Sequence, residues 1–323
     1  MGKEKEYEIV QHTMMNHLEV LIVEMTSRNP HGHSDLEIGT VIEGSLELIL
    51  DQKHIKLEKN DVYVINRYQI HSFTGKGKES LVLAFQINSE FYKNLSSDQN
   101  RFQFRSIIRN ADAGHDRLHS NLMECAGSYY SQKPFFEIKC ASLLFDSLYL
   151  LAGMEGSRII SDKEYAMTRS STLRLNRILE YMAEHYAEPV RLEDLADAEH
   201  ITSYHVSHFI KKALGISFQE YLNNLRFEQA YRLVTQTSFN IFEICMECGF
   251  SSSRYLNQMF LKRTGCRALD LRKQKITSEL ENTVLPIKNI QKRLSFEQSK
   301  NLFQEYSGAG ASGLLEPAES GGS

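Results

Sequence analysis

Residues 192–202 have the sequence LEDLADAEHIT, and residues 241–252 have the sequence IFEICMECGFSS. The second stretch repeats the pattern of the first, because apolar or small residues fall at corresponding positions. The matched residues are Leu192, Leu195, Ala196 and Ile201 in the first stretch and Ile241, Ile244, Cys245 and Phe250 in the second. An internal duplication of this kind predicts two copies of one supersecondary unit.

The duplication continues beyond these stretches, with one extra residue in the second copy. Here the matched residues are one position further apart along the chain than before. They are Val206, Ile210 and Gly215 in the first copy and Leu256, Phe260 and Gly265 in the second. Each copy is therefore expected to be a helix, a tight turn and a second helix. The hydroxyl group of Thr202 or Ser252 can cap the second helix, and small Ala196 or Cys245 is expected where the two helices cross.

Residues 217–235 lie between the two copies and predict an amphipathic helix of about 19 residues, about 28 Å long. A helix of that length can set the distance between the second helices of the two copies. The whole of residues 173–275 has helical periodicity, and its interruptions predict seven helices.

These residues resemble the DNA-binding domain of the AraC/XylS family of bacterial transcription regulators. The motifs that carry the resemblance are Leu192-x-x-Leu-Ala, Thr202-x-x-x-Val, Ile210-Lys-Lys-x-x-Gly-Ile-Ser-Phe-x-x-Tyr-Leu, Arg226-x-x-x-Ala and Ile241-x-x-Ile-Cys-x-x-Cys-Gly-Phe-Ser-Ser. Two positions depart from the family pattern, since Leu256 stands where Phe is usual and no Pro follows Gly265. The resemblance implies a double helix-turn-helix domain that binds double-stranded promoter DNA.

A recognition helix in the major groove exposes its outward side chains to base edges. The residues expected to face DNA are Ser203, Tyr204, Ser207, His208 and Lys211 in the first copy and Ser253, Arg254, Asn257 and Gln258 in the second. Arg254 can bind guanine through two hydrogen bonds, and Asn257 or Gln258 can bind adenine in the same way. The alternatives for each residue are a phosphate contact or plain solvent exposure. Arg226 could contact a phosphate or form an internal ion pair.

The N-terminal part has a different periodicity. Residues 20–87 alternate short apolar and polar runs, separated by turn residues, which predicts an antiparallel β-barrel or sandwich. Residues 118–130 and 135–151 carry apolar residues at helical spacing, and they predict a helical hairpin. The resemblance to the AraC/XylS family implies that this hairpin pairs two subunits or transmits the state of the sensor. The alternative is that this hairpin only packs across the barrel.

Residues 31–71 resemble the two-part motif of the cupin barrels. The motif is His31-x-His33-x-x-x-Glu37-x-x-x-x-x-x-Gly44, followed by Asn60-Asp61, with Asn60 where glycine is usual, and by His71. His31 and His33 would share one face of a strand, and Glu37 and His71 could converge on them inside the barrel. Three interpretations stay open: an effector pocket without metal, a divalent metal site, or structural histidines.

We therefore expect an α+β multidomain protein with five segments. They are a cupin-like β-barrel sensor at residues 1–90, a helical dimerisation or transmission segment at 91–152, a linker at 153–172, the all-α double helix-turn-helix domain at 173–275, and a C-terminal extension at 276–323. The last part of the extension is rich in Gly and Ser and is expected to be disordered.

The bulk properties limit the function without identifying it. The net charge of the 323 residues is −4, and residues 173–275 carry 14 Lys and Arg against 12 Asp and Glu, so any charge that faces DNA must be local. Five cysteines without framework spacing favour a reducing compartment, and the pair Cys245 and Cys248 is not expected to bind zinc. No apolar stretch is long enough for a bilayer span, so a cytoplasmic protein without a membrane partner is expected.

The function expected from both resemblances is a ligand-responsive transcription regulator rather than an enzyme. In this hypothesis a small-molecule effector binds the barrel of a homodimer and changes how the dimer engages promoter DNA and RNA polymerase. The resemblance to the family suggests a sugar as the effector. Activation is more usual than repression in the family, and no cofactor is required. Two alternatives remain: a cupin metalloenzyme that holds Fe, Mn or Zn with the same four residues, and a regulator whose barrel binds no effector.

Overall fold

The long strand β1 (Leu18–His31) organises the N-terminal half, because both of its faces are buried. Alternate residues of an extended strand point to opposite sides. The residues on the outer side are Leu18, Val20 and Ile22, and those on the inner side are Leu21, Val23 and Met25. The two sides belong to two separate hydrophobic cores, one between sheet and helices and one inside the curled sheet.

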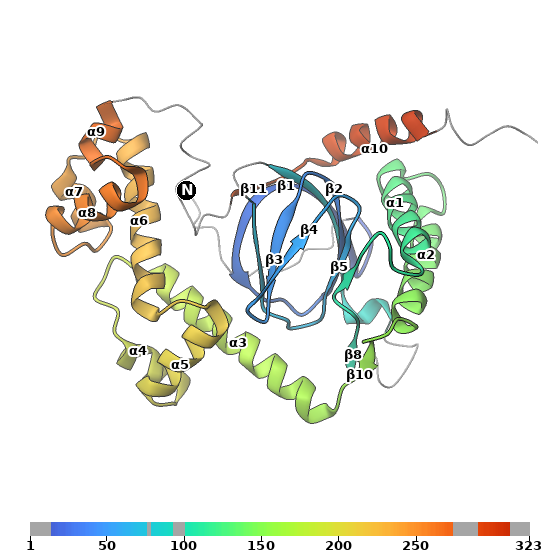
Figure 1. Cartoon of the computed structure of the whole chain (residues 1–323), viewed down its shortest axis with the longest axis horizontal. Coiled ribbons are helices and arrows are strands. Elements are labelled where there is room, and N and C mark those ends of the chain that lie inside the picture. The colour runs from blue at the N-terminus through green and yellow to red at the C-terminus, as the bar shows by residue number, and fades with distance from the viewer. Residues whose placement is uncertain (1–13, 76–78, 93–100, 274–289, 311–323) are drawn as a thin grey trace, which may run out of the picture.

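The computed structural model describes residues 14–75, 79–92, 101–273 and 290–310, and it shows β1 in the middle of one antiparallel sheet (Figure 1). The other elements of this half are β2 (Leu36–Glu43), β3 (Leu46–Leu50), β4 (Lys53–Leu57), β5 (Val62–Ile65), β6 (His71–Thr74), β7 (Ser80–Ile87), the 3-10 helix η1 (Ser89–Phe91), β8 (Phe102–Gln103) and β9 (Ile107–Ile108). The strand order is β4-β3-β6-β1-β7-β2-β5-β9. The sheet curls around its inner core, which confirms the predicted cupin-like fold.

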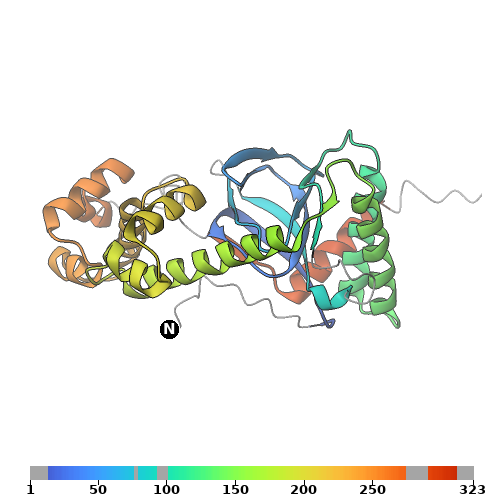
Figure 2. The same cartoon turned by 90° about the horizontal axis from the view of Figure 1, so that it is seen from below.

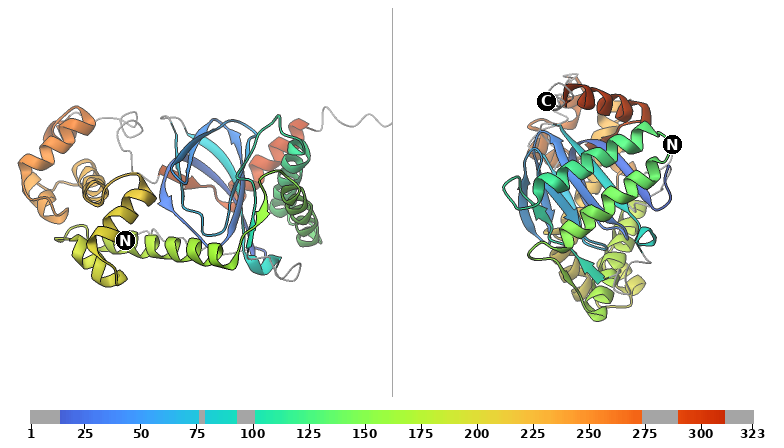
Figure 3. Two further views of the ribbon diagram at one scale, coloured as in Figure 1. Left: turned by 60° about the horizontal axis from the view of Figure 1, so that its bottom comes forward. Right: turned by 90° about the vertical axis from the view of Figure 1, so that its right-hand side faces the viewer.

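Helices α1 (His115–Ser131) and α2 (Phe136–Ala152) form the predicted hairpin. They lie side by side across the outer face of the sheet (Figure 3). The hydroxyl group of Tyr130 donates a hydrogen bond of 2.9 Å to the backbone oxygen of Val20, so α1 is attached directly to β1.

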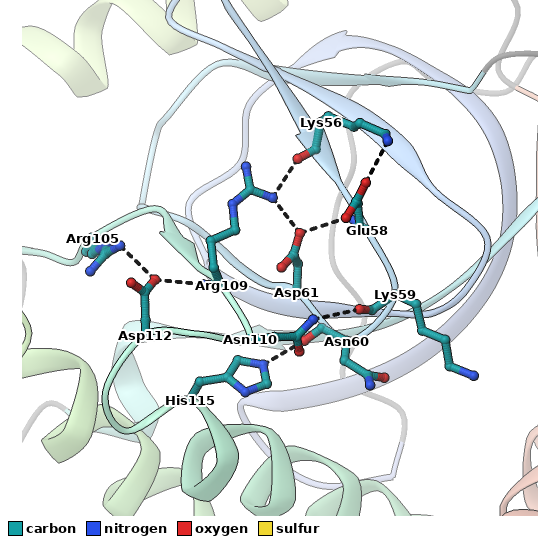
Figure 4. A network of polar contacts seen from close by, with 10 residues as sticks. All are labelled: Lys56, Glu58, Lys59, Asn60, Asp61, Arg105, Arg109, Asn110, Asp112 and His115. Atoms are coloured by element: carbon teal, nitrogen blue, oxygen red, sulfur yellow. Dashed lines mark hydrogen bonds and ion pairs between the residues drawn. The ribbon is translucent and has the colours of Figure 1, made fainter.

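A polar network ties the β4–β5 turn to the segment that leads into α1 (Figure 4). Arg109 forms an ion pair with buried Asp61 and donates a hydrogen bond of 2.7 Å to the backbone oxygen of Lys56. The ring nitrogen Nε2 of His115 lies 2.9 Å from the backbone oxygen of Asn60. Asn60 has a φ of +69°, a left-handed conformation that Asn tolerates better than most residues, and this explains why glycine is usual at this motif position.

The predicted linker at residues 153–172 contains the start of a long helix. After the short strand β10 (Arg158–Ile159), which pairs with β8, residues Asp162–His185 form one continuous helix, α3. The side chain of Ser161 caps the helix by accepting a hydrogen bond from the backbone N–H of Glu164. The first half of α3 is mostly exposed and therefore polar, so its composition resembles that of a linker although it is helical.

The C-terminal helical domain has two hydrophobic cores joined by one helix. Its elements are the second half of α3, then α4 (Leu192–Glu199), α5 (Ser203–Leu214), α6 (Phe218–Gln236), α7 (Ile241–Glu247), α8 (Ser253–Thr264) and α9 (Ala268–Lys273). Tyr221 and Leu222 of α6 pack in the first core, whereas Phe227 and Val234 of the same helix pack in the second. The predicted count of seven helices agrees with the described residues 162–273.

The C-terminal extension returns to the sensor, which the sequence did not predict. Strand β11 (Ile290–Arg293) pairs with β1, and helix α10 (Phe296–Gly310) packs on α1 (Figure 1). Arg293 forms an ion pair with buried Glu19, and the ring of Phe303 stacks on Tyr130 with centroids 5.8 Å apart. The tail expected to be disordered begins at about Ser307, but residues 307–310 form the end of α10, and the tail from residue 311 lies outside the described residues. Among the residues that are described, no helix is long and apolar enough to span a membrane.

Candidate DNA interface and histidine site

An equivalent backbone hydrogen bond closes the turn in both helix-turn-helix units. In the first unit the backbone N–H of Ile201 donates to the oxygen of Ala196 at 3.0 Å, and in the second unit Phe250 donates to Cys245 at 2.9 Å. The helices α5 and α8 then begin one residue later in the second unit, so Ser251 is the extra residue of its turn. The duplication seen in the sequence is therefore a duplication of structure.

The predicted hydroxyl caps are present. The side-chain oxygen of Thr202 accepts a hydrogen bond of 3.3 Å from the backbone N–H of His205, at the start of α5. The side-chain oxygen of Ser252 accepts the equivalent hydrogen bond of 3.2 Å from Tyr255, at the start of α8. Each cap satisfies a backbone donor that has no partner within its helix, and so fixes where the helix begins.

Gly249 in the second turn has a φ of +70°. A Cβ atom at this position would lie 2.5 Å from the backbone oxygen of Ala187, so the turn is pressed against the chain that follows α3. Only glycine combines a left-handed backbone with such a close approach. Gly249 therefore fixes the second unit relative to the first.

The predicted DNA-facing residues of α5 all lie at the surface. Tyr204, His208 and Lys211 are exposed, and Ser203 and Ser207 are half-buried. The rings of Tyr204 and His208 are nearly parallel, with centroids 6.3 Å apart, and 76% of Tyr204 is accessible to solvent. The opposite face of α5 is fixed by buried Val206 and Ile210. This side of α5 can present an aromatic ring and several hydrogen-bonding groups to DNA.

On α8, Arg254 and Gln258 are exposed, and Ser253 and Asn257 are half-buried. Arg254 makes no hydrogen bond or ion pair within the described residues, so its guanidinium group is available to DNA. Asn257 differs, because its side-chain nitrogen donates to the oxygen of Ser253 at 3.0 Å and its side-chain oxygen accepts from the N–H of Ala268 at 3.2 Å. Its amide holds α9 against α8, so the predicted base contact by Asn257 would require breaking both bonds.

A second site lies inside the sensor, where the side chains of His31, His33 and His71 converge. One ring nitrogen from each histidine lies within 4.8 Å of the others, and all three residues are buried. Their centroids are 4.1 Å apart for His31 and His71 and 5.2 Å apart for His33 and His71. The predicted strand position of His33 is wrong, because β1 ends at His31 and His33 lies in the following loop.

The orientation of each imidazole ring is set by a backbone carbonyl group. The Nδ1 atoms of His31, His33 and His71 lie 2.8, 2.9 and 3.0 Å from the oxygen atoms of Asn29, Asp35 and Gln69, respectively. A carbonyl oxygen accepts only, so each Nδ1 carries a proton, and a neutral imidazole held in this way keeps the lone pair of its Nε2 atom. This is the arrangement that orients a histidine ligand towards a metal ion.

Glu37 on β2 completes the cluster. Its Oε2 atom lies 3.3 Å from Nε2 of His33, and the hydroxyl group of Tyr63 donates to its Oε1 atom at 2.9 Å. Gln86 contacts the same carboxylate at 3.4 Å. The four predicted effector residues are therefore brought together from the end of β1, the next loop, β2 and the start of β6.

Burial and the neighbouring charges control the protonation of this cluster. Burial, together with the positive charge of His33, lowers the pKa of His71 to about 4. Burial also lowers the pKa of His31 well below its usual value, with help from Arg28. Burial alone would raise the pKa of Glu37, but the hydrogen bond and charge of His33 outweigh it and the pKa falls to about 2. Neutral imidazoles and an ionised carboxylate are the forms that bind a cation.

The histidine cluster borders the packed core of the sensor on one side and a cavity on another. Large apolar side chains fill the inside of the curled sheet, among them Leu48, Tyr63 and Phe73. A cavity of about 540 Å³ lies instead between the sensor and the helices α5, α6 and α8. Its wall includes His71, Arg28 and Arg263, so it touches the histidine cluster from outside the core.

Comparisons with known proteins agree with the two domains that carry these sites. The family of the helix-turn-helix domain matches residues 195–274, and the family of the cupin domain matches residues 19–87. The uncharacterized HTH-type transcriptional regulator YijO of Escherichia coli strain K12 is 32% identical over 119 residues, which are 37% of this chain and 42% of that protein. The HTH-type transcriptional activator RhaS of Escherichia coli O1:K1 is 28% identical over 103 residues, which are 32% of this chain and 37% of that protein.

The chain therefore contains a helix-turn-helix domain and a cupin domain, and the curated relatives that it matches are HTH-type transcription regulators. The matches span less than half of the length of either curated relative. Similar solved structures include the C-terminal domain of AraT, a response regulator from Geobacillus stearothermophilus. It is 29% identical, the match covers 33% of this chain and 88% of that chain, and the TM-score is 0.31. ToxT from Vibrio cholerae is 14% identical, with a TM-score of 0.38. The match covers 80% of this chain and 98% of the ToxT chain.

Two residues of the chain acquire roles that its sequence did not reveal. Arg226 donates hydrogen bonds of 2.7 and 2.8 Å to the backbone oxygens of Tyr186 and Glu188, so it holds the end of α3 and forms no ion pair there. Tyr63 anchors Glu37 from the neighbouring strand β5. The only sequence signal for Tyr63 was its place in an alternating strand, which also fits a plain core residue.

Proposed function

We propose that this chain is a sequence-specific DNA-binding regulator of transcription, in which α5 and α8 enter two adjacent segments of the major groove. The observation that carries the proposal is the duplicated, capped recognition unit with exposed side chains on both second helices. Tyr204 and His208 would contact bases from α5, and Arg254 and Gln258 would contact bases from α8. Lys211, Ser203, Ser207 and Ser253 would contact bases or phosphates around them.

Footprinting on the upstream region of the protein's own gene, at stated salt concentrations, tests this proposal. The wild-type chain is expected to protect two adjacent segments on one face of the duplex, and the variant Arg254→Ala with His208→Ala is expected to lose that protection. Lys163→Ala is the matched control, because it removes one positive charge from the exposed start of α3, at the far end of that helix from α5 and α8 (Figure 2). Absence of protection at low salt would contradict the proposal.

We also propose that the histidine cluster is the effector site and that it holds a divalent transition-metal ion. Three imidazoles and one carboxylate suit Zn²⁺, Fe²⁺ or Ni²⁺, and the protonated Nδ1 atoms support this use of the Nε2 atoms. When bound, the ion would supply a fixed positive charge and a coordination position for an effector. The adjoining cavity carries Arg28, Asp51 and Asn224 in its wall, which suits a polar small molecule such as a sugar.

Metal analysis of the purified chain by mass spectrometry tests the ion. One equivalent of bound Zn²⁺ is expected in the wild-type chain, and much less in His71→Ala, because the cluster then lacks one of three imidazoles. His54→Ala is the matched control, since His54 lies on β4 with an exposed side chain. Full occupancy in His71→Ala would contradict this assignment, and an effector site without metal would then be the better interpretation. Turnover of a substrate by the loaded protein would support a metalloenzyme instead.

We infer a homodimer from the surface of α2. Phe135, Ile138 and Tyr149 are 76%, 68% and 75% exposed, although all three are apolar or aromatic. Ile138 and Tyr149 are about three helical turns apart, so they share one face of α2, to which a second copy can bind. Light scattering is expected to give a dimer for the wild type and a monomer for Ile138→Asp with Tyr149→Asp. Met167→Asp is the control, because Met167 is an exposed apolar residue of α3.

We propose activation rather than repression, by contact of the DNA-bound dimer with RNA polymerase. The name of RhaS, a transcriptional activator, supports this direction. Transcription in vitro from the footprinted promoter is expected to increase when the regulator is added. A decrease would show that the regulator represses.

A further inference from the structure

Helix α3 connects the two halves of the molecule. It runs along the underside of the sensor and continues into the first recognition unit (Figure 2). Two of its residues, Thr172 and Asn176, lie on the side that faces the sensor, and they are 1% and 7% exposed. Residues 172 and 176 are one helical turn apart, so both side chains point in nearly the same direction.

Both side chains bind backbone atoms next to the histidine cluster. The side-chain nitrogen of Asn176 donates a hydrogen bond of 2.8 Å to the backbone oxygen of Gly32, the residue between His31 and His33. The hydroxyl group of Thr172 donates to the backbone oxygen of Tyr68. Buried polar groups are costly to leave without a partner, so these contacts favour one docked position of α3.

The two backbone segments that α3 contacts are themselves joined. The backbone N–H of Tyr68 donates a hydrogen bond of 2.8 Å to the oxygen of His33. Tyr68 precedes Gln69, whose oxygen orients the ring of His71. Any change in the positions of these imidazoles must therefore be shared with the atoms that Thr172 and Asn176 bind.

The approach of α3 to this region is very close. A Cβ atom on Gly32 would lie only 2.5 Å from the Cγ2 atom of Thr172. Glycine at position 32 thus allows α3 to reach the backbone between His31 and His33. The two segments are closely packed, because even a methyl group on residue 32 would force Thr172 to move.

The other side of α3 belongs to the DNA-binding domain. Leu175, Ile178 and Met182 are buried in the same core as Val206 of the recognition helix α5. Residues 172 and 182 are about 15 Å apart along one uninterrupted helix. A displacement of α3 at the sensor is therefore transmitted to the first recognition unit.

We propose that Thr172 and Asn176 are positioning residues that couple the occupancy of the histidine cluster to DNA binding. An ion at the cluster fixes the imidazoles, the carbonyl groups of Gly32 and Tyr68 follow, and α3 is held in its docked position. Without the ion this position is less favoured. The inference rests on the proposed metal site, and linkage requires that DNA change the affinity for the ion by the same factor as the ion changes the affinity for DNA.

The test measures the Kd for footprinted DNA by fluorescence anisotropy, in a zinc-loaded and a zinc-free preparation. We expect the wild-type chain to show a ratio of about 5 to 150 between the two Kd values, the usual range of such coupling. Asn176→Leu and Thr172→Val remove the hydrogen bonds while keeping the size of the side chain, and both are expected to bring the ratio near one. Ser170→Ala, on the exposed side of α3, is the control and should keep the wild-type ratio.

The outcomes separate this inference from the proposals beneath it. Zinc bound at one equivalent with a wild-type ratio of one would overturn the coupling and leave the metal site standing. A ratio that stays at the wild-type value in both Asn176→Leu and Thr172→Val would also overturn it. A wild-type chain that binds no zinc would overturn the metal site and the coupling together. Circular dichroism of each variant, with its zinc content, shows that a lost ratio does not come from misfolding.

Discussion

Replacing Gly249 with alanine should destabilise the second recognition unit more than the same replacement at Gly265. Both glycines have left-handed backbones, with φ of +70° and +74°. The surroundings differ, because no atom lies within 4 Å of a Cβ built on Gly265, whereas a Cβ on Gly249 meets the backbone oxygen, carbonyl carbon and Cα of Ala187 at 2.5, 2.8 and 2.9 Å. Comparing the two alanine variants therefore distinguishes the cost of backbone strain from the cost of steric overlap.

The left-handed conformation alone costs alanine about 1–2 kcal/mol, which is the expected loss for Gly265→Ala. Gly249→Ala has the same cost and adds overpacking against backbone atoms, typically about 1–3 kcal/mol. The total loss for Gly249→Ala is then about 2–5 kcal/mol. A difference of about 1.4 kcal/mol between the two variants corresponds to a tenfold change in the folding equilibrium.

Urea unfolding followed by circular dichroism measures both losses, with the slope of the transition used to check that the same surface is exposed in each variant. Gly215→Ala, also left-handed and with no atom within 4 Å of its Cβ, repeats the strain-only measurement in the first unit. Equal losses for Gly249→Ala and Gly265→Ala would refute the argument, because they would mean that the contact with Ala187 carries no energy.

Three further outcomes are expected. Tyr63→Phe removes the donor to Glu37 and should weaken zinc binding about 10–100-fold in a competition titration, while a change below twofold would mean that the hydroxyl group does not support the site. Phe303→Ala removes a buried ring that stacks on Tyr130 and should lower the free energy of unfolding by about 3 kcal/mol, and an unchanged urea midpoint would speak against docking of α10. Burial raises the pKa of Cys248 to about 12, so its thiol stays protonated at pH 8 and should react with DTNB only after unfolding. Rapid labelling of Cys248 itself in the folded chain would contradict this, and peptide mass spectrometry distinguishes it from labelling of half-buried Cys266.

The helical domain could be predicted from sequence because its signals are local. Apolar spacing and hydroxyl caps depend on residues within one or two helical turns, and Thr202, Ser252 and the duplicated turns lie where the pattern places them. Asn257 shows the limit of such reasoning. Its outward position on α8 was correct, but its hydrogen bond to Ala268 depends on how α9 folds back, and no local pattern contains that information.

The sensor was predictable in its strands and less so in its boundaries. The motif identified His31, His33, Glu37 and His71, and the structure brings them together. The helical conformation of residues 162–172 was not predicted, because the exposed first half of α3 has no apolar stripe. The docking of α3 by Asn176 depends on a glycine far away in the sequence, which composition and periodicity cannot reveal.

The return of β11 and α10 to the sensor makes that domain discontinuous in the chain. The polypeptide leaves the sensor through α3, forms the DNA-binding domain, and then returns to β1 and α1. The DNA-binding domain is therefore an insertion within the sensor. Exchange of modules between regulators by a single crossover near residue 162 would therefore separate β1 from one of its partner strands. A functional chimera needs two crossovers, and the residues 290–310 have to come from the same parent as the barrel.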